Sequence, residues 1–305
     1  MCPGILRLTD PRFLGDKRHN DFNHFLVTRV GDLSVDQNVD KLVDICFAKT
    51  NVPGLDSTFW RFENMDTAVH SPELKQRISK RIKASDRTLG SIARILIEEL
   101  TEFSGCDRSC VKFPVDIGHI AELLQWFPES KIVHITRDPR AMAMSKTNDP
   151  SGTAIKVMQH PRLAWLIRKL SVWLVIAEYR RTARIHRRFR HLRNYKLFRY
   201  EDLLAEPETT LRDVCKFIDV EFSDDLLHPE RGIHLHQPSS LTGKQNKAFD
   251  ASAAVRWQSV IPPFDKWLIT TLTKKSMQTL GYDPATHPIF RTNHESLSSA
   301  CPQTV

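Results

Sequence analysis

The stretch KIVHITRDPRAMAMSK, residues 131–146, combines a strand, a turn and the start of a helix. Its first six residues have the pattern of a buried β-strand. Asp138 then suits the N-cap of a helix, and Pro139 suits the first helical position. Arg137 and Arg140 flank this helix start, where the helix dipole already disfavours cations. Either the arginines pair with surface carboxylates, or they bind an anion together with the backbone N–H groups of the helix.

Strand and helix patterns alternate along most of the chain. Strands that alternate with helices form a parallel sheet with helices on its faces, so the sequence predicts an α/β fold. Ser85 and Asp86 are candidate caps of the first long helix, and Gly105 is expected to stop it. The Arg137 turn is expected at the carboxyl ends of the strands, where open α/β sheets bind ligands. The predicted strands cover residues 110–114, 131–136 and 195–200, and the predicted helices cover residues 89–103, 116–127, 161–193 and 207–218.

Composition indicates an ordinary folded protein that favours anionic partners. The chain has 305 residues and a net charge of +8, which attracts nucleotides, phosphates, acidic sugars or nucleic acid. It has no run of about 20 uncharged apolar residues, so no membrane-spanning helix is expected. The six cysteines lack the spacing of a zinc site and are expected to be reduced thiols. We expect a cytoplasmic location, or the Golgi lumen only if an upstream segment carries an anchor.

The stretch from Ile132 to Lys146 resembles the 3′-phosphate-binding segment of sulfotransferases, which use 3′-phosphoadenosine 5′-phosphosulfate (PAPS). In that family an arginine after the strand and a serine eight positions later bind the 3′-phosphate. The resemblance implies these roles for Arg137 and Ser145. Geometry alone does not indicate Ser145, because it lies about 10 Å along the helix from the cap.

Three further stretches resemble other parts of the same family, in the family's order. Together they cover roughly residues 85–283, and they imply the α/β fold of sulfotransferases, which is P-loop-NTPase-like with a parallel sheet flanked by helices. The stretches are CVKFPVDIGHIAELLQWFPESK at 110–131, FRYEDLLAEPETTLRDVCKFIDVEF at 198–222, and SSLTGKQNKAFDASAAVRWQSVIPP at 239–263, with the resemblance continuing through LGYD at 280–283.

One element of the family pattern is missing. The family binds the 5′-phosphosulfate with a loop rich in Gly, Ser and Thr, and no such loop is found in this sequence. The opening stretch LTDPRFLGD, residues 8–16, resembles the family segment that follows this loop. We therefore expect an N-terminally truncated sulfotransferase-like domain over residues 1–283 and a loose tail over residues 284–305. A degenerate, non-catalytic relative is the alternative.

The resemblance implies transfer of a sulfuryl group to a hydroxyl or amine, a reaction that needs a base and cations but no metal. Asp10 occupies the place of a catalytic glutamate found in some members, and Lys112 matches a lysine that borders the active-site cleft. His119 is an alternative base. Each residue also has a structural interpretation: a turn cap beside Pro11, a surface lysine at a strand end, and a packed or solvated histidine.

Three more residues are assigned to PAPS by the resemblance. Tyr200 matches a tyrosine near the adenine, although a buried strand tyrosine would serve the core equally well. Lys244 and Lys247 lie where many members place basic residues on the 3′-phosphate. Trp257 is expected in the core.

The run from Arg180 to Arg193 holds seven arginines and no acidic residue. It is either a solvated helix face or a docking surface for an acidic glycan acceptor. Nucleic-acid binding is less favoured, because no aromatic residues are interleaved with the charge. The acceptor stays open among carbohydrates, lipids and other small molecules. The rival functions are an inactive protein that binds adenosine 3′,5′-bisphosphate and a basic nucleic-acid-binding protein.

Overall fold

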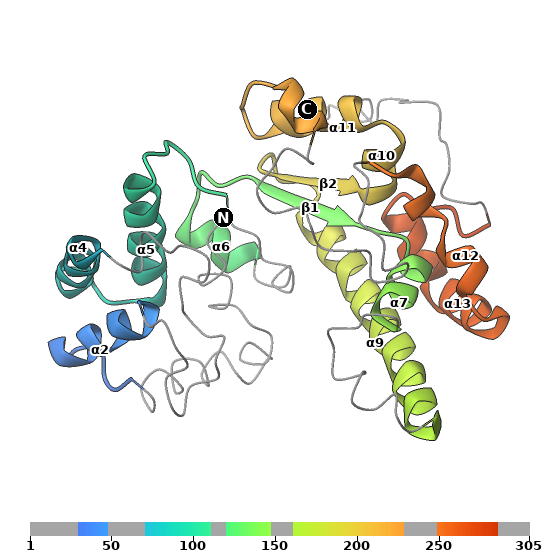
Figure 1. Ribbon diagram of the computed structural model, residues 1–305, viewed down its shortest axis with the longest axis horizontal. Helices are drawn as coiled ribbons and strands as arrows, with labels where there is room; N and C mark the ends of the chain where they lie inside the picture. The colour runs from blue at the N-terminus through green and yellow to red at the C-terminus, as the bar shows by residue number, and fades with distance from the viewer. Residues whose placement is uncertain (1–29, 48–70, 111–119, 148–160, 229–248, 286–305) are drawn as a thin grey trace, which may run out of the picture. The chain divides into compact units, whose positions relative to one another are not determined.

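The chain divides into two compact units, Met1–Ser130 and Lys131–Val305, each with its own hydrophobic core. The extent of the predicted sulfotransferase-like domain, residues 1–283, and the predicted tail stay predictions. The computed structural model of the protein describes residues 30–47, 71–110, 120–147, 161–228 and 249–285 (Figure 1).

The described part of the first unit is helical. Its helices are α2 (Asp36–Cys46), α4 (Pro72–Lys83), α5 (Leu89–Phe103) and α6 (Ile120–Trp126). Each of the first three is amphipathic, and α4 packs against both α2 and α5. Their apolar faces form one core, which includes Val39, Leu42, Leu74, Ile78, Ile92 and Leu96.

Helix α5 spans the residues predicted for it, but its cap differs from the prediction. Thr88, rather than Ser85 or Asp86, is the N-cap, and its hydroxyl accepts a backbone N–H of the first turn. Asp86 instead accepts the N–H of Thr88 at 3.0 Å, because the chain turns at Arg87, which has a left-handed φ of 57°. Gly105, with a φ of 62°, follows the end of the helix as predicted.

The second unit contains a parallel pair of strands, β1 (Ile132–Thr136) and β2 (Tyr195–Arg199). Helix α7 (Pro139–Thr147) follows β1, and α10 (Tyr200–Ala205) follows β2 (Figure 1). This arrangement confirms the predicted α/β fold with parallel strands. Of the third predicted strand, only Cys110 is described, and it is not in a strand.

Three helices of the second unit pack around α7. Helix α7 contacts α9, α12 and α13, and Figure 1 shows α7, α9 and α13 gathered beside the carboxyl end of β1. Trp257, a core residue as predicted, is 1% exposed between them. The remaining elements are α9 (Pro161–Phe189), α11 (Pro207–Phe217), η3 (Asp224–Leu227), η5 (Ala251–Ala254), α12 (Trp257–Val260) and α13 (Pro263–Thr279).

Two predicted boundaries are wrong. Strand β2 ends at Arg199, so Tyr200 is the first residue of α10 and not a strand residue. The guanidinium of Arg199 binds the carboxylate of Asp202 in the first turn, which holds the chain in the helical direction. Helix α9 ends at Phe189 rather than at 193, because the chain must turn before β2 begins.

Helix α9 presents two kinds of exposed surface. Its buried side includes Val172, Val175 and Tyr179. The seven arginines from Arg180 to Arg193, five in α9 and two after it, are all exposed, as both the solvated-face and the docking-surface interpretations require. The earlier half of the helix exposes Trp165, Leu166, Leu170, Trp173 and Leu174.

Between the strands, the hydroxyl of Tyr195 lies 2.5 Å from Nδ1 of His134 and 3.0 Å from Nδ1 of His186. Burial, and then the nearby His186, lowers the pKa of His134 from 6.5 to about 3. Between about pH 3 and pH 6.5 the unfolded chain therefore binds a proton at this histidine and the folded chain does not. The contribution of His134 to the free energy of unfolding is fully present above about pH 6.5 and is lost as the pH falls.

Protonation of His134 in the unfolded chain is expected to lower the free energy of unfolding by about 2 kcal/mol when the pH falls from 7 to 5. Urea unfolding of the wild type and of His134→Gln at both pH values measures the effect. Because glutamine does not titrate, the free energy of unfolding of the variant is expected to fall less between pH 7 and pH 5, by about that amount. Equal losses in the two proteins would show that His134 is not the responsible group.

Candidate functional site

Arg137 lies directly after the carboxyl end of β1 and is half-buried. Its guanidinium carbon is 4.8 Å from the centre of the Tyr200 ring, and its Nη2 donates to the carbonyl of Ala253 at 3.0 Å. Its Nε is buried and has no hydrogen-bond partner among the described residues. Within the same part of the chain Arg137 has no carboxylate partner. A buried N–H without an acceptor on a guanidinium without a counter-ion fits an anionic ligand such as a phosphate.

Arg140 has the opposite character. Its guanidinium binds the carboxylate of Asp138, with 2.6 Å between Nη2 and Oδ2, and both side chains are buried. Asp138 also accepts the backbone N–H of Arg140 at 2.8 Å, so it caps α7 as predicted. The predicted pairing of an arginine with a carboxylate therefore holds for Arg140, but in the interior and not at the surface. It leaves Arg137 as the cation available at this turn.

Ser145 lies in α7 and is half-buried. It is about two helical turns beyond the cap, as the sequence requires. No hydrogen bond joins Arg137 and Ser145, so the two are linked here only by their places on one strand-turn-helix segment. Their joint role stays a prediction.

The sequence interpretation missed two buried residues at the same turn. Glu201 accepts the backbone N–H of Asp138 at 2.9 Å and the hydroxyl of Tyr282 at 2.7 Å. Burial raises the pKa of Glu201, and burial raises the pKa of Tyr282 well above 10, so the tyrosine is a neutral donor. The sequence did offer one indication of a role for Glu201: it directly follows Tyr200, the tyrosine that the resemblance assigns to the adenine.

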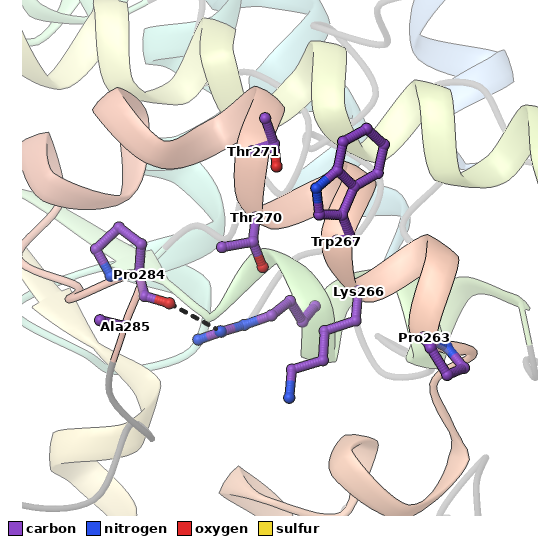
Figure 2. A pocket seen from close by; sticks show the side chains of 8 residues that line it. Pro263, Lys266, Trp267, Thr270, Thr271, Pro284 and Ala285 are labelled. Carbon is purple, nitrogen blue, oxygen red and sulfur yellow. Dashed lines mark hydrogen bonds between the residues drawn. The ribbon is translucent and has the colours of Figure 1, made fainter.

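A pocket of about 380 Å³ lies on the α13 side of Arg140 (Figure 2). Arg140 donates to the carbonyl of Pro284 at this pocket over a long 3.5 Å. Its charge is already matched by Asp138, so Lys266 is the lining cation without a partner carboxylate among the described residues. The pocket therefore lacks a free arginine fork, and it is a poorer phosphate site than the Arg137 turn. Its lining is Arg140, Pro263, Lys266, Trp267, Thr270, Thr271, Pro284 and Ala285.

Five of the predicted site residues lie outside the described residues. They are Asp10, Lys112, His119, Lys244 and Lys247. Within the described ranges, no group of three or more His, Cys, Asp or Glu side chains is arranged to hold a metal ion. No helix in those ranges is both long and apolar enough to cross a bilayer.

Residues 31–224 match the model of the sulfotransferase family. The chain belongs to the sulfotransferase family. The match covers more than half of the chain and includes β1, the Arg137 turn, α7 and β2. It confirms the family recognised from the sequence.

The curated relatives are protein-tyrosine sulfotransferases. Protein-tyrosine sulfotransferase A of Caenorhabditis elegans is 22% identical over 188 residues, which cover 59% of this chain and 46% of the relative. Protein-tyrosine sulfotransferase 1 of Danio rerio is 24% identical over 212 residues, which cover 67% of this chain and 57% of the relative. The enzyme of Drosophila melanogaster is 24% identical over 190 residues, 36% of its length. The chain thus spans about half the length of these relatives.

Two solved sulfotransferase domains are similar in structure. The domain from the curacin biosynthetic pathway has a TM-score of 0.45 and 16% identity, and it covers 68% of this chain and 73% of that chain. The domain from the Synechococcus PCC 7002 olefin synthase has a TM-score of 0.47 and 18% identity, with coverages of 93% and 84%. Both TM-scores are below 0.5, so the fold assignment rests on the strand pairing and the family match.

The cytoplasmic location expected from the sequence is wrong. The relatives found are protein-tyrosine sulfotransferases, which are enzymes of the Golgi, and no observation on this chain supports the cytoplasm. The expectation that the six cysteines are reduced thiols therefore misled the interpretation.

Proposed function

We propose that the protein transfers a sulfuryl group from PAPS to a hydroxyl group. The observation that carries this proposal is the Arg137 turn. It places an arginine without a carboxylate partner at the carboxyl end of a parallel strand, in a chain of the sulfotransferase family. In open α/β sheets ligands bind at this end of the strands.

In this proposal the 3′-phosphate of PAPS is bound by Arg137 and Ser145. The contact with the Tyr200 ring and the bond to Ala253 hold the guanidinium in one orientation. The buried Nε N–H would donate to a phosphate oxygen. A planar guanidinium suits a phosphate, because two of its N–H groups can donate to two oxygens. Ser145 adds a hydroxyl donor from the side of α7. Tyr200 lies close enough to Arg137 to contact the adenosine part.

The groups that act on the transferred sulfuryl are proposed from the family resemblance alone. Asp10 or His119 takes the proton from the acceptor hydroxyl, and Lys112 stabilises the charge that develops on the sulfuryl group and the leaving phosphate. Lys244 and Lys247 add positive charge near the 3′-phosphate. The reaction as written needs no metal ion.

For the acceptor, the names of the curated relatives favour the phenolic hydroxyl of a protein tyrosine. The seven exposed arginines of α9 and the residues after it suit an acceptor that carries negative charge, such as an acidic peptide or an acidic glycan. Carbohydrate, lipid and small phenol acceptors stay in the comparison because the sequence alone allowed them.

Transfer of radiolabelled sulfate from PAPS to a panel of acceptors tests the proposal. The panel contains a tyrosine peptide flanked by acids, the same peptide with phenylalanine for tyrosine, an acidic glycan, a glycolipid and a simple phenol. We expect label in the tyrosine peptide and none in its phenylalanine control. Absence of transfer to every acceptor, together with no binding of adenosine 3′,5′-bisphosphate, would contradict the proposed function.

A further inference from the structure

Glu201 is a buried carboxylate that connects three parts of the second unit. It is 3% exposed and is the second residue of α10. Its Oε1 accepts the backbone N–H of Asp138 at the start of α7, and its Oε2 accepts the hydroxyl of Tyr282 in the segment after α13. One side chain therefore joins the beginnings of two helices to the end of a third.

The bond to Asp138 completes a helix cap that α7 cannot complete by itself. In a capping box, a glutamate or glutamine at the third helical position accepts the backbone N–H of the N-cap residue. In α7 the third helical position is Ala141, which has no side-chain acceptor. Glu201 supplies this acceptor from a position 63 residues away in the chain.

The same contact reaches Arg137. Thr136 lies opposite Arg199 in the last pair of the sheet, and the neighbouring segments stay together beyond it. Arg137 stacks on Tyr200, and the next residue, Asp138, is bonded by the next side chain, Glu201. The first two residues of α10 therefore hold both residues of the turn: Tyr200 contacts the side chain of Arg137, and Glu201 accepts the backbone N–H of Asp138.

We propose that Glu201 is a positioning residue: it fixes the turn through Asp138 so that Arg137 meets the 3′-phosphate in one orientation. The inference rests on the proposed role of Arg137. A buried carboxylate is costly unless its oxygens are hydrogen-bonded, and here both oxygens are. An apolar side chain would fill the space without that cost but would leave the N–H of Asp138 without this acceptor. Tyr282 holds the carboxylate in place from the other side.

Calorimetric affinities for adenosine 3′,5′-bisphosphate and adenosine 5′-monophosphate test this role, because only the first nucleotide carries the 3′-phosphate. Glu201→Ala is expected to weaken the bisphosphate about tenfold and the monophosphate less than about twofold. Glu201→Gln keeps an acceptor for Asp138 and is expected to restore most of the affinity. In the double variant with Arg137→Ala, loss of Glu201 is expected to add little, since the arginine that it positions is gone.

Equal weakening of both nucleotides by Glu201→Ala, or a full additional loss in the double variant, would overturn the positioning role. If Glu201→Ala does not fold, Tyr282→Phe provides the test, with an expected loss of about threefold for the bisphosphate alone. If Tyr282→Phe changes neither affinity, or weakens both nucleotides equally, the positioning role is overturned. Failure of the proposed function looks different, because the wild type itself would bind the two nucleotides equally.

Discussion

Replacing Arg140 by alanine is expected to lower the free energy of unfolding by about 3–5 kcal/mol. The Arg140 side chain is 4% exposed and that of its partner Asp138 is 0% exposed, so the substitution leaves a buried carboxylate without its counter-charge. It also removes the guanidinium from above the Trp257 ring, where its central carbon lies 4.5 Å from the ring centre. Urea unfolding followed by circular dichroism measures the change.

Two variants show that the buried charge is the cause. Arg212→Ala breaks a pair with Glu208 whose side chains are both more than half exposed, and it removes the guanidinium from the Phe222 ring, so it is expected to cost about 1 kcal/mol or less. The double variant Asp138→Asn/Arg140→Met removes both charges and keeps a capping side chain, so it is expected to be more stable than Arg140→Ala. If Arg140→Ala costs no more than Arg212→Ala, the pair does not stabilise the turn.

Replacing Arg137 by alanine is expected to weaken binding of adenosine 3′,5′-bisphosphate by about 2–3 kcal/mol, or roughly 30- to 150-fold. The phosphate loses a charged, two-pronged donor and keeps the cost of its own desolvation. The effect differs from that of Arg140, because Arg137 has no carboxylate partner among the described residues. Titration calorimetry on the wild type and the variant measures it.

The matched control for charge is Arg184→Ala, which removes one exposed arginine from α9 and lowers the net charge equally. It is expected to change the affinity less than about twofold, since an exposed charge is screened by salt. Arg137→Lys keeps the charge without the fork and is expected to recover only part of the loss. An Arg137→Ala variant with wild-type affinity would mean that the arginine serves the fold alone.

The sequence predicted the features that depend on neighbouring residues. The alternation of residues 132–136, the cap at Asp138 and Pro139 at the first helical position all lie within one short segment. Together they placed β1, the turn and α7 correctly. The parallel pairing with β2 followed from the helices between the strands.

The features that the sequence did not predict depend on contacts between distant residues. The bond from Tyr282 to Glu201 spans 81 positions, and no local pattern indicates that these two residues meet. Pairing of Arg140 with a surface carboxylate was one of two alternatives, and the arginine is instead buried because Asp138, two residues away, neutralises it. Tyr200 was assigned to a strand because its neighbours alternate, whereas the Arg199–Asp202 pair turns the chain into α10.

The central proposal is that the Arg137 turn binds the 3′-phosphate of PAPS. A crystal structure of the protein with adenosine 3′,5′-bisphosphate tests this most directly. We predict 3′-phosphate oxygens at about 2.7–3.1 Å from both the Arg137 guanidinium and the Ser145 hydroxyl. A 3′-phosphate bound elsewhere, for example at Lys266 and Thr270 in the pocket beside α13, with Arg137 still bonded only to Ala253, would contradict it.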